Sequence, residues 1–335
     1  MKYNSYSVLE KGGPVKLVQS EKPGLGMLEC RIKIQTCGIC HSDLHMIDND
    51  WRISRYPLVP GHEIVGTVIE TGAMVGHLKI GDRAGVGWQA GACMECSDCI
   101  RGDENLCEKN IGTIVGRDGG FAEEITLDSR FAFRIPDGLP SENASPLLCA
   151  GITVYSALHY AGMRGGGNIG VIGMGGLGHL AVQFAAKLGN RVTVFTTSED
   201  KAEFARSLGA SEVLINPKRK EKPSGKLNII INTAPNDLDW SYFLSLLDSD
   251  GTLTFVGVPP SPMELNIGQL LSKRKRITAS PIGGRAIMTE MLKIAADHKV
   301  FPVIEVFPPS EIEKAMDKVR QNKIRYRAVI DFRKS

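Results

Sequence analysis

The chain has 335 residues, of which 42% are apolar, and 40 Lys and Arg against 37 Asp and Glu leave a formal net charge of +3. This size and apolar content are sufficient for two hydrophobic cores. The charge is too small to indicate a nucleic acid or a membrane surface as partner, and no apolar run is long enough for a transmembrane helix. Eight cysteines without a secretory signal indicate a reducing compartment, so we expect a cytoplasmic protein.

The first part of the chain, up to about residue 150, has the pattern of short β-strands. Stretches of alternating polarity, such as residues 30–38 and 61–70, are interrupted by Gly and Pro about every ten residues. This pattern is typical of twisted antiparallel strands or a small barrel.

Within this part, four cysteines lie in the C-x2-C-x2-C-x7-C spacing: Cys93, Cys96, Cys99 and Cys107. Gaps of two residues let one turn present neighbouring thiolates to a single tetrahedral zinc ion. The segment 93–107 has no apolar periodicity, which predicts a loop. A loop without a hydrophobic core needs a metal ion or a cross-link to hold it together. Disulfides and an iron–sulfur cluster remain alternatives, although the segment lacks the Cys-Pro ending of bacterial ferredoxin runs. The spacing favours a structural zinc site.

After residue 150, apolar strands alternate with helical patterns in the rhythm of a doubly wound parallel sheet, which predicts an α/β domain. We expect strands at 168–173, 191–196, 212–215, 228–233 and 251–257, and helices at 177–189, 201–210 and 238–248. From about Gly283 the pattern changes again, with helices expected at 285–299 and 309–323 and a closing strand at 327–332. The pattern alone does not decide to which domain this tail belongs.

A G-x-G-x-x-G motif follows the apolar strand 168–173 and opens the next helix: Gly173, Gly175, Gly176, Leu177 and Gly178 span it. In this context the first glycine makes a tight turn, the second lets a pyrophosphate approach the backbone, and the third packs helix on strand. The helix N-terminus then faces the phosphates. The motif predicts a dinucleotide-binding site.

The end of the following strand indicates which dinucleotide is bound. It carries hydroxyl and ammonium groups: Thr196, Thr197, Ser198 and Lys201. An NAD site usually offers a carboxylate there for the ribose hydroxyls, whereas these groups favour the 2′-phosphate of NADP(H). The neighbouring Glu199 and Asp200 keep NAD open as the alternative.

A second, scattered metal site is indicated by Cys40, His62 and Cys149. Two thiolates and one imidazole leave a fourth zinc position open, as in catalytic sites. On spacing alone, Cys30 and Cys37 are equally available as ligands.

The order of these motifs resembles the zinc-dependent medium-chain alcohol dehydrogenases over essentially the whole chain. Within that family the chain looks most like the cinnamyl alcohol dehydrogenase branch, and most of all like bacterial NADPH-dependent aldehyde reductases. The resemblance rests on CGICHSDLH, MIDNDW, YPLVPGHE, GHEIVGTVIETG, GDR, the four-cysteine loop, LLCAGITVY and GMGGLG.

The resemblance implies a GroES-like, mostly β catalytic domain made from residues 1–150, with the structural zinc loop 93–107, and completed by residues 284–335. It implies a Rossmann nucleotide-binding domain at residues 151–283 and a homodimer.

Carried over by position, the resemblance makes Cys40, His62 and Cys149 the catalytic zinc ligands. Glu63 matches a carboxylate that approaches or joins the zinc. Asp43 matches the carboxylate that orients His62, a role expected for any metal-bound imidazole.

The resemblance also implies a proton relay, in which Ser42 exchanges a proton with the reacting oxygen and His45 passes it toward solvent. Thr153 matches a threonine that packs on the nicotinamide, and Ser280 begins a segment that closes over it. The side chains proposed as apolar walls of the substrate pocket are Trp51 and Trp88.

The expected activity is reversible, zinc-dependent reduction of aldehydes to primary alcohols, with hydride from NADPH, a zinc-polarised carbonyl, and two Zn²⁺ per chain. A polyol or NAD-linked alcohol dehydrogenase of the same superfamily and a catalytically silent nucleotide-binding protein remain alternatives. A zinc-ribbon module for nucleic acid predicts a basic loop, whereas this loop carries acidic residues: Glu95, Asp98, Asp103 and Glu104.

Overall fold

A computed structural model describes residues 2–334. The chain forms two compact units, the first made of Met1–Cys149 with Gly284–Ser335 and the second of Ala150–Gly283. Within the described range, no helix has the length and apolarity needed to cross a membrane.

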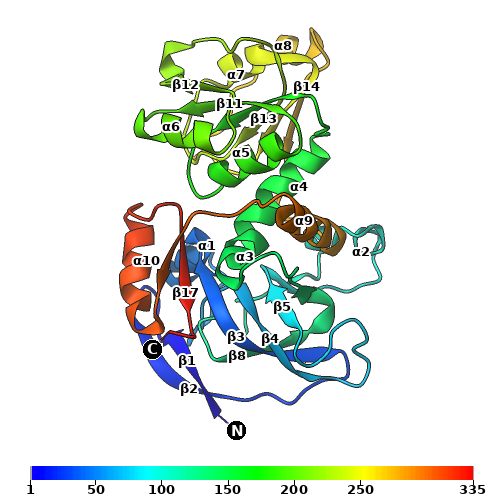
Figure 1. Cartoon of the computed structure of the whole chain (residues 1–335), viewed down its shortest axis with the longest axis vertical. Helices are drawn as coiled ribbons and strands as arrows, with labels where there is room; N and C mark the ends of the chain where they lie inside the picture. Colours follow the sequence, from blue (N-terminus) through cyan, green and yellow to red (C-terminus); the bar gives the residue numbers. More distant parts are fainter. Residues whose placement is uncertain (1, 335) are drawn as a thin grey trace. The chain divides into compact units, whose positions relative to one another are not determined.

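The second unit is built on a six-stranded parallel sheet with the strand order β12-β11-β10-β13-β14-β15 (Figure 1). Numbered from β10, this is the 3-2-1-4-5-6 order of the Rossmann fold, whose topological switch point lies between β10 and β13. The strands are β10 (Asn168–Ile172), β11 (Arg191–Thr196), β12 (Glu212–Ile215), β13 (Leu227–Asn232), β14 (Leu247–Phe255) and β15 (Arg276–Ala279). The α/β fold predicted from the sequence is therefore confirmed.

Helix α4 (Ile152–Tyr160) precedes the first of these strands, and four helices lie in the connections between them: α5 (Gly178–Lys187), α6 (Asp200–Ser207), α7 (Trp240–Leu246) and α8 (Ile267–Leu271). The central strand β10 is buried from Ile169 to Ile172, which explains why it reads as a continuous apolar run. Three elements, α4, α8 and β15, were not expected from the pattern. The last two are short, and neither has a fully buried residue that would reveal its period. Helix α4 is buried along most of its length, so polar residues do not mark a helical period.

The first unit is built on a mostly antiparallel sheet with the order β16-β17-β3-β4-β5-β9, in which β8 also pairs with β3. Its strands are β3 (Glu29–Ile39), β4 (Glu63–Thr71), β5 (Arg83–Val86), β8 (Glu124–Asp128), β9 (Phe133–Arg134), β16 (Ile304–Phe307) and β17 (Arg327–Asp331). Since β17 pairs with β3 on one side and with β16 on the other, the last strand of the chain lies inside the sheet to which the first half contributes most strands. The core of this unit is apolar, with Ile32, Ile64 and Phe121 completely buried.

Smaller elements complete the first unit. Two further sheets are formed by β1 (Lys2–Val8) with β2 (Val15–Glu21) and by β6 (Gln89–Gly91) with β7 (Ile111–Gly112). The helices are α1 (His41–Asp48), α2 (Ser97–Arg101), α3 (Ser141–Pro146), α9 (Arg285–Asp297) and α10 (Ile312–Arg320), of which α10 lies beside β17 (Figure 1).

Candidate active site

The start of helix α1 organises the first cluster of functional side chains. Cys40 is its N-cap residue, and its backbone N–H donates to Asp43 Oδ2 at 2.9 Å. The other oxygen, Oδ1, accepts from the backbone N–H of Gly61 at 2.9 Å and lies 2.8 Å from His62 Nδ1. The fully buried Asp43 therefore fixes the ring of His62 with Nε2 directed away from it.

The thiols of Cys40 and Cys149 meet this imidazole. One ligand atom from each of Cys40, His62, Glu63 and Cys149 lies within 4.8 Å of the other three. The two sulfurs are 3.9 Å apart, close to the roughly 3.8 Å separation of two thiolates on a tetrahedral zinc with Zn–S bonds of about 2.3 Å. Within the described chain, the buried Nε2 of His62 has no hydrogen-bond partner. An orphaned imidazole nitrogen facing two thiols fits a zinc ion.

The thiol of Cys40 is readily ionised in this cluster. Its pKa lies well below the ordinary value, because a hydrogen bond from the Cys149 thiol, supported by His62 and Arg327, outweighs the effect of burial. A thiolate is the form that ligates a metal.

Glu63 forms the far side of the cluster. Its Oε1 is paired with the guanidinium of Arg327 on β17, and both side chains are buried. Its Oε2 has no partner within the described chain. Gly38 lies opposite Glu63 in the pairing of β3 with β4, and a Cβ at Gly38 would overlap the carboxylate. Burial raises the pKa of Glu63 to about 7 against the opposing charge of Arg327.

An aromatic row extends from the cluster to the surface. The ring of Trp88 meets His62 edge-on with centroids 5.0 Å apart, and Trp51 lies 5.7 Å from Trp88. His45 follows, 5.4 Å from Trp51, and its Nδ1 is 2.7 Å from Asp50 Oδ2. Ser42, the second residue of α1, is half-buried.

Two residues of this site were missed by sequence reasoning. Asp50 lies five residues after His45, within the MIDNDW segment that was used only for the resemblance, and its spacing on the turn after α1 could have indicated the contact. Arg327 is separated from Glu63 by 264 positions, so no local signal could have revealed that pair.

The four cysteines of the loop also converge. Their sulfurs lie within 4.8 Å of one another, with Cys93 at 3.8 Å from Cys99 and 3.6 Å from Cys107. Backbone N–H groups of Glu95 and Cys96 lower the pKa of the Cys93 thiol to about 6. The segment was expected to be an irregular loop, but it contains the single-turn helix α2, which presents Cys99 beside the N-cap residue Cys96.

The glycine-rich turn lies at the carboxyl end of β10. Gly173 has φ +88°, a conformation that favours glycine, and its N–H donates to Phe195 O. A Cβ at Gly178 would overlap the carbonyl of Gly173, so only glycine lets α5 start this close to the strand. At Gly175, no described atom would lie within 4 Å of an added Cβ. The turn leaves room for a ligand above its second glycine.

The remaining residues expected at the cofactor also belong to the second unit. Thr196 is buried at the end of β11, whereas Thr197 and Lys201 are exposed and Ser198 is half-buried. Thr153 is a half-buried residue of α4. Ser280 follows β15, and its hydroxyl lies 3.2 Å from that of Ser156 on the same helix α4.

Comparisons with known proteins agree with this geometry. Residues 26–137 match the alcohol dehydrogenase GroES-like domain, and residues 176–297 match the zinc-binding dehydrogenase model. The chain is 40% identical over 333 residues to the aldehyde reductase AdhA of Synechocystis sp., covering 99% of both chains. The chain belongs to the zinc-dependent medium-chain alcohol dehydrogenase family. Its branch is that of the cinnamyl alcohol dehydrogenases.

Two further relatives of this dehydrogenase bear on its function. A probable mannitol dehydrogenase of Fragaria ananassa is 43% identical over 318 residues, covering 92% of this chain and 89% of that protein. The structure of the cinnamyl alcohol dehydrogenase from Helicobacter pylori, complexed with NADP(H), superposes with a TM-score of 0.90 at 32% identity and covers 100% of both chains.

Proposed function

We propose that this protein catalyses the reversible, zinc-dependent reduction of aldehydes to primary alcohols with NADPH. The observation that carries the proposal is the buried cluster of Cys40, His62, Glu63 and Cys149, in which the imidazole Nε2 is directed at the thiols without a hydrogen-bond partner among the described residues. Relatives named aldehyde reductase and cinnamyl alcohol dehydrogenase support this choice of reaction.

Two zinc ions per chain are part of the proposal. Cys40, His62 and Cys149, with Glu63 nearby, would hold the catalytic ion, and Cys93, Cys96, Cys99 and Cys107 the structural one. The two sets differ in chemistry, since four thiolates close a tetrahedral site, whereas two thiolates and an imidazole leave one position open.

NADP(H) is the proposed cofactor, bound by the turn from Gly173 to Gly178 and by the end of β11. The exposed hydroxyl of Thr197 and the exposed ammonium of Lys201 offer a 2′-phosphate hydrogen bonds and a positive charge, and the NADP(H) complex of the Helicobacter pylori relative supports the assignment. Thr153 and Ser280 are proposed to contact the nicotinamide. The second unit is accordingly the nucleotide-binding domain, and the first unit is the catalytic domain.

When bound, zinc supplies a Lewis acid for the carbonyl and NADPH supplies the hydride. The protein's own part is orientation and proton transfer. Asp43 fixes the tautomer and the orientation of the His62 ring, because its Oδ1 contacts His62 Nδ1 and is itself held by the backbone N–H of Gly61. Ser42 is proposed to pass a proton to the product oxygen. His45, whose Nδ1 lies 2.7 Å from Asp50 Oδ2, is proposed to replace that proton from solvent. Trp51 and Trp88 offer an apolar wall that suits an uncharged, apolar or aromatic aldehyde.

A homodimer in the cytoplasm completes the proposal. The sheet of the second unit ends at β15, an edge strand with one unpaired side. The preceding segment exposes large apolar side chains, with Val258 81%, Ile267 58% and Leu271 76% exposed. Exposed apolar side chains that lie close in sequence to an open sheet edge are suited to contact with a second copy of the chain. All eight cysteines are unpaired, in keeping with a reducing compartment.

Polyol oxidation is the second candidate, because a relative named a probable mannitol dehydrogenase is 43% identical to this chain. A polyol would need polar groups along the pocket to bind its hydroxyls. The aromatic row Trp51, Trp88 and His62 offers few, which favours the aldehyde.

The test measures initial rates with NADPH and with NADH on a panel of aliphatic and aromatic aldehydes and on mannitol with NADP⁺. Zinc per chain is determined on the same preparation. We expect two zinc ions, NADPH-dependent turnover of aldehydes and little activity on mannitol. One zinc per chain with no turnover of any substrate would instead favour a nucleotide-binding protein without catalysis.

A further inference from the structure

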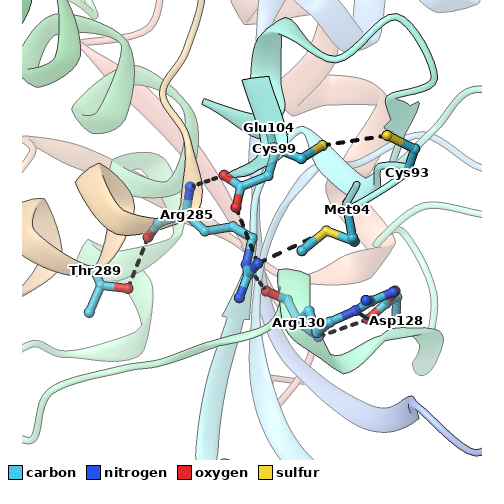
Figure 2. A network of polar contacts seen from close by, with 8 residues as sticks. All are labelled: Cys93, Met94, Cys99, Glu104, Asp128, Arg130, Arg285 and Thr289. Atoms are coloured by element: carbon cyan, nitrogen blue, oxygen red, sulfur yellow. Dashed lines mark hydrogen bonds and ion pairs between the residues drawn. The ribbon is translucent and has the colours of Figure 1, made fainter. Parts of the chain in front are cut away.

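The four-cysteine lobe, residues 93–107, contains a buried carboxylate. The four cysteines account for metal binding by the lobe, but they do not account for the burial of this carboxylate. Glu104 is only 3% exposed, in a segment whose other acidic side chains lie nearer the surface. Both of its oxygens are used by one residue outside the lobe (Figure 2). Oε2 accepts from the backbone N–H of Arg285 at 3.0 Å, and Oε1 accepts from Arg285 Nη1 at 3.1 Å.

These contacts place Glu104 at the start of helix α9. The N-cap residue of α9 is Gly284, which has no side chain to satisfy the first N–H groups. A Cβ at position 284 would overlap the carbonyl of Gly102, so the helix cannot carry its own Ser or Asp cap there. The cap comes instead from a residue 181 positions earlier. A carboxylate also complements the positive end of a helix dipole.

The side chain of Arg285 completes a clamp on the lobe. Its Nε donates to the carbonyl of Arg130 at 2.9 Å, and Nη1 lies 4.0 Å from the sulfur of Met94 (Figure 2). Its guanidinium also lies 5.7 Å from the ring centre of Phe131. Met94 and Glu104 belong to the lobe itself. Arg285 is also the second residue of the returning C-terminal segment, so the clamp fixes where that segment enters the first unit.

Helix α9 in turn packs against the segments that carry the catalytic cluster. A Cβ at Gly87 would meet both the carbonyl of Leu148 and the side chain of Met288 from α9. Leu148 precedes Cys149, and Gly87 precedes Trp88. A shift of α9 would therefore displace Leu148 and Gly87, which are the sequence neighbours of the proposed zinc ligand Cys149 and of Trp88 in the proposed pocket wall.

We infer that Glu104 couples metal binding by the four cysteines to the docking of α9, so that the bound metal and the docked helix stabilise each other. The inference rests on the proposed structural zinc site. Glu104 begins a short 3₁₀ turn, Glu104–Leu106, between Cys99 and Cys107. A metal that binds both cysteines would restrain this turn and with it the carboxylate at the helix start. Such coupling is reciprocal by thermodynamic necessity, which gives two independent measurements.

The first measurement is the rate at which a chelator removes the lobe metal, followed with a chromogenic zinc dye. It is made on Cys40→Ser protein, which retains only the four-cysteine cluster intact. We expect Glu104→Gln to release zinc about tenfold faster, since a charge-assisted hydrogen bond is replaced by a neutral one. The matched control is Arg101→Gln, which removes two ion pairs of an exposed side chain in the same lobe, with Asp98 and with Asp103. Its release should stay within about twofold of the parent.

The second measurement needs no variant at Glu104. Hydrogen exchange is followed in the Cys40→Ser protein with the lobe metal present and removed, so that loss of a second metal does not contribute. The hydrogen-bonded amides at the start of α9, those of Arg285 and Met288, should lose protection on metal removal, whereas those of α10 should keep it. Equal release from the Glu104→Gln and Arg101→Gln proteins, or unchanged protection of α9, would overturn the coupling. A Cys40→Ser protein that binds no zinc at all would instead refute the structural zinc site proposed above.

Discussion

At the scale of single residues, one carboxylate sets the geometry of the proposed catalytic centre. Asp43 accepts hydrogen bonds from Cys40 N and Gly61 N and contacts His62 Nδ1. A single buried side chain therefore positions two of the proposed zinc ligands, Cys40 and His62. Its helix-capping contact is predictable because it stands three residues after Cys40. Its contact with His62 is not predictable from spacing, because it depends on how β4 returns to the start of α1.

Replacing Cys40 with Ser tests whether this centre is catalytic. We expect kcat/KM for aldehyde reduction to fall by at least about a thousandfold, because loss of the Lewis acid removes several kcal/mol of transition-state stabilisation. NADPH binding, measured by fluorescence titration, should be retained, since the cofactor residues lie in the other unit. The control is Cys30→Ala, which changes a buried cysteine of β3 outside both metal clusters. Normal turnover of the Cys40→Ser protein would remove Cys40 from the ligand set.

The cofactor preference is tested at Thr197. This residue is exposed, whereas Thr196 is buried, so an Asp at position 197 can meet a ligand without placing a charge in the core. We expect Thr197→Asp to raise the dissociation constant of NADPH by about tenfold or more, because a carboxylate repels the 2′-phosphate. The dissociation constant of NADH should stay the same or fall. Dissociation constants for the two cofactors give the ratio. An unchanged ratio would mean that the ribose lies elsewhere.

At the scale of elements, glycine has two different roles in the turn between β10 and α5: one glycine allows close packing, and another leaves space for a ligand. Gly178 is required by packing, because its Cα faces the carbonyl of Gly173, whereas Gly175 faces open space. The order strand, turn, helix was predictable because β10 is an uninterrupted apolar run followed by the motif. Elements without a buried face, such as α8 and β15, gave no such signal.

Two alanine variants distinguish these roles. Gly178→Ala should lower the free energy of unfolding by about 1–3 kcal/mol, because the added methyl forces helix and strand apart. Gly175→Ala should unfold at the wild-type temperature but bind NADPH more weakly, because the methyl stands where a pyrophosphate would approach. Thermal unfolding and cofactor titration on both proteins provide the comparison. Equal loss of stability in the two variants would contradict this division.

At the scale of the whole molecule, the fold class was predictable and the assembly of the sites was not. The parallel sheet, apart from its edge strand β15, follows from buried strands alternating with helices, and the four cysteines of the loop are close in sequence. The other metal cluster joins residues from α1, β4 and the turn after α3, and spacing left Cys30 and Cys37 as equal candidates. Only the resemblance selected Cys40, His62 and Cys149, because tertiary folding, and not local pattern, brings them together.

The proposed dimer is the last feature that belongs to the whole molecule. Ile267 and Leu271 stand one turn apart on α8 and are both more than half exposed, close in sequence to the open edge strand β15. If this surface joins two copies, each side chain is buried twice by symmetry, so two charges introduced per chain place four in one interface. We expect the Ile267→Glu, Leu271→Glu double variant to sediment as a monomer of 36.4 kDa, whereas the wild type sediments at twice that mass. The control is Leu17→Glu, which adds a charge at an equally exposed leucine on β2 and should leave the dimer intact. A double variant that still sediments as a dimer would place the interface on another face, and a monomeric wild type would refute the dimer itself.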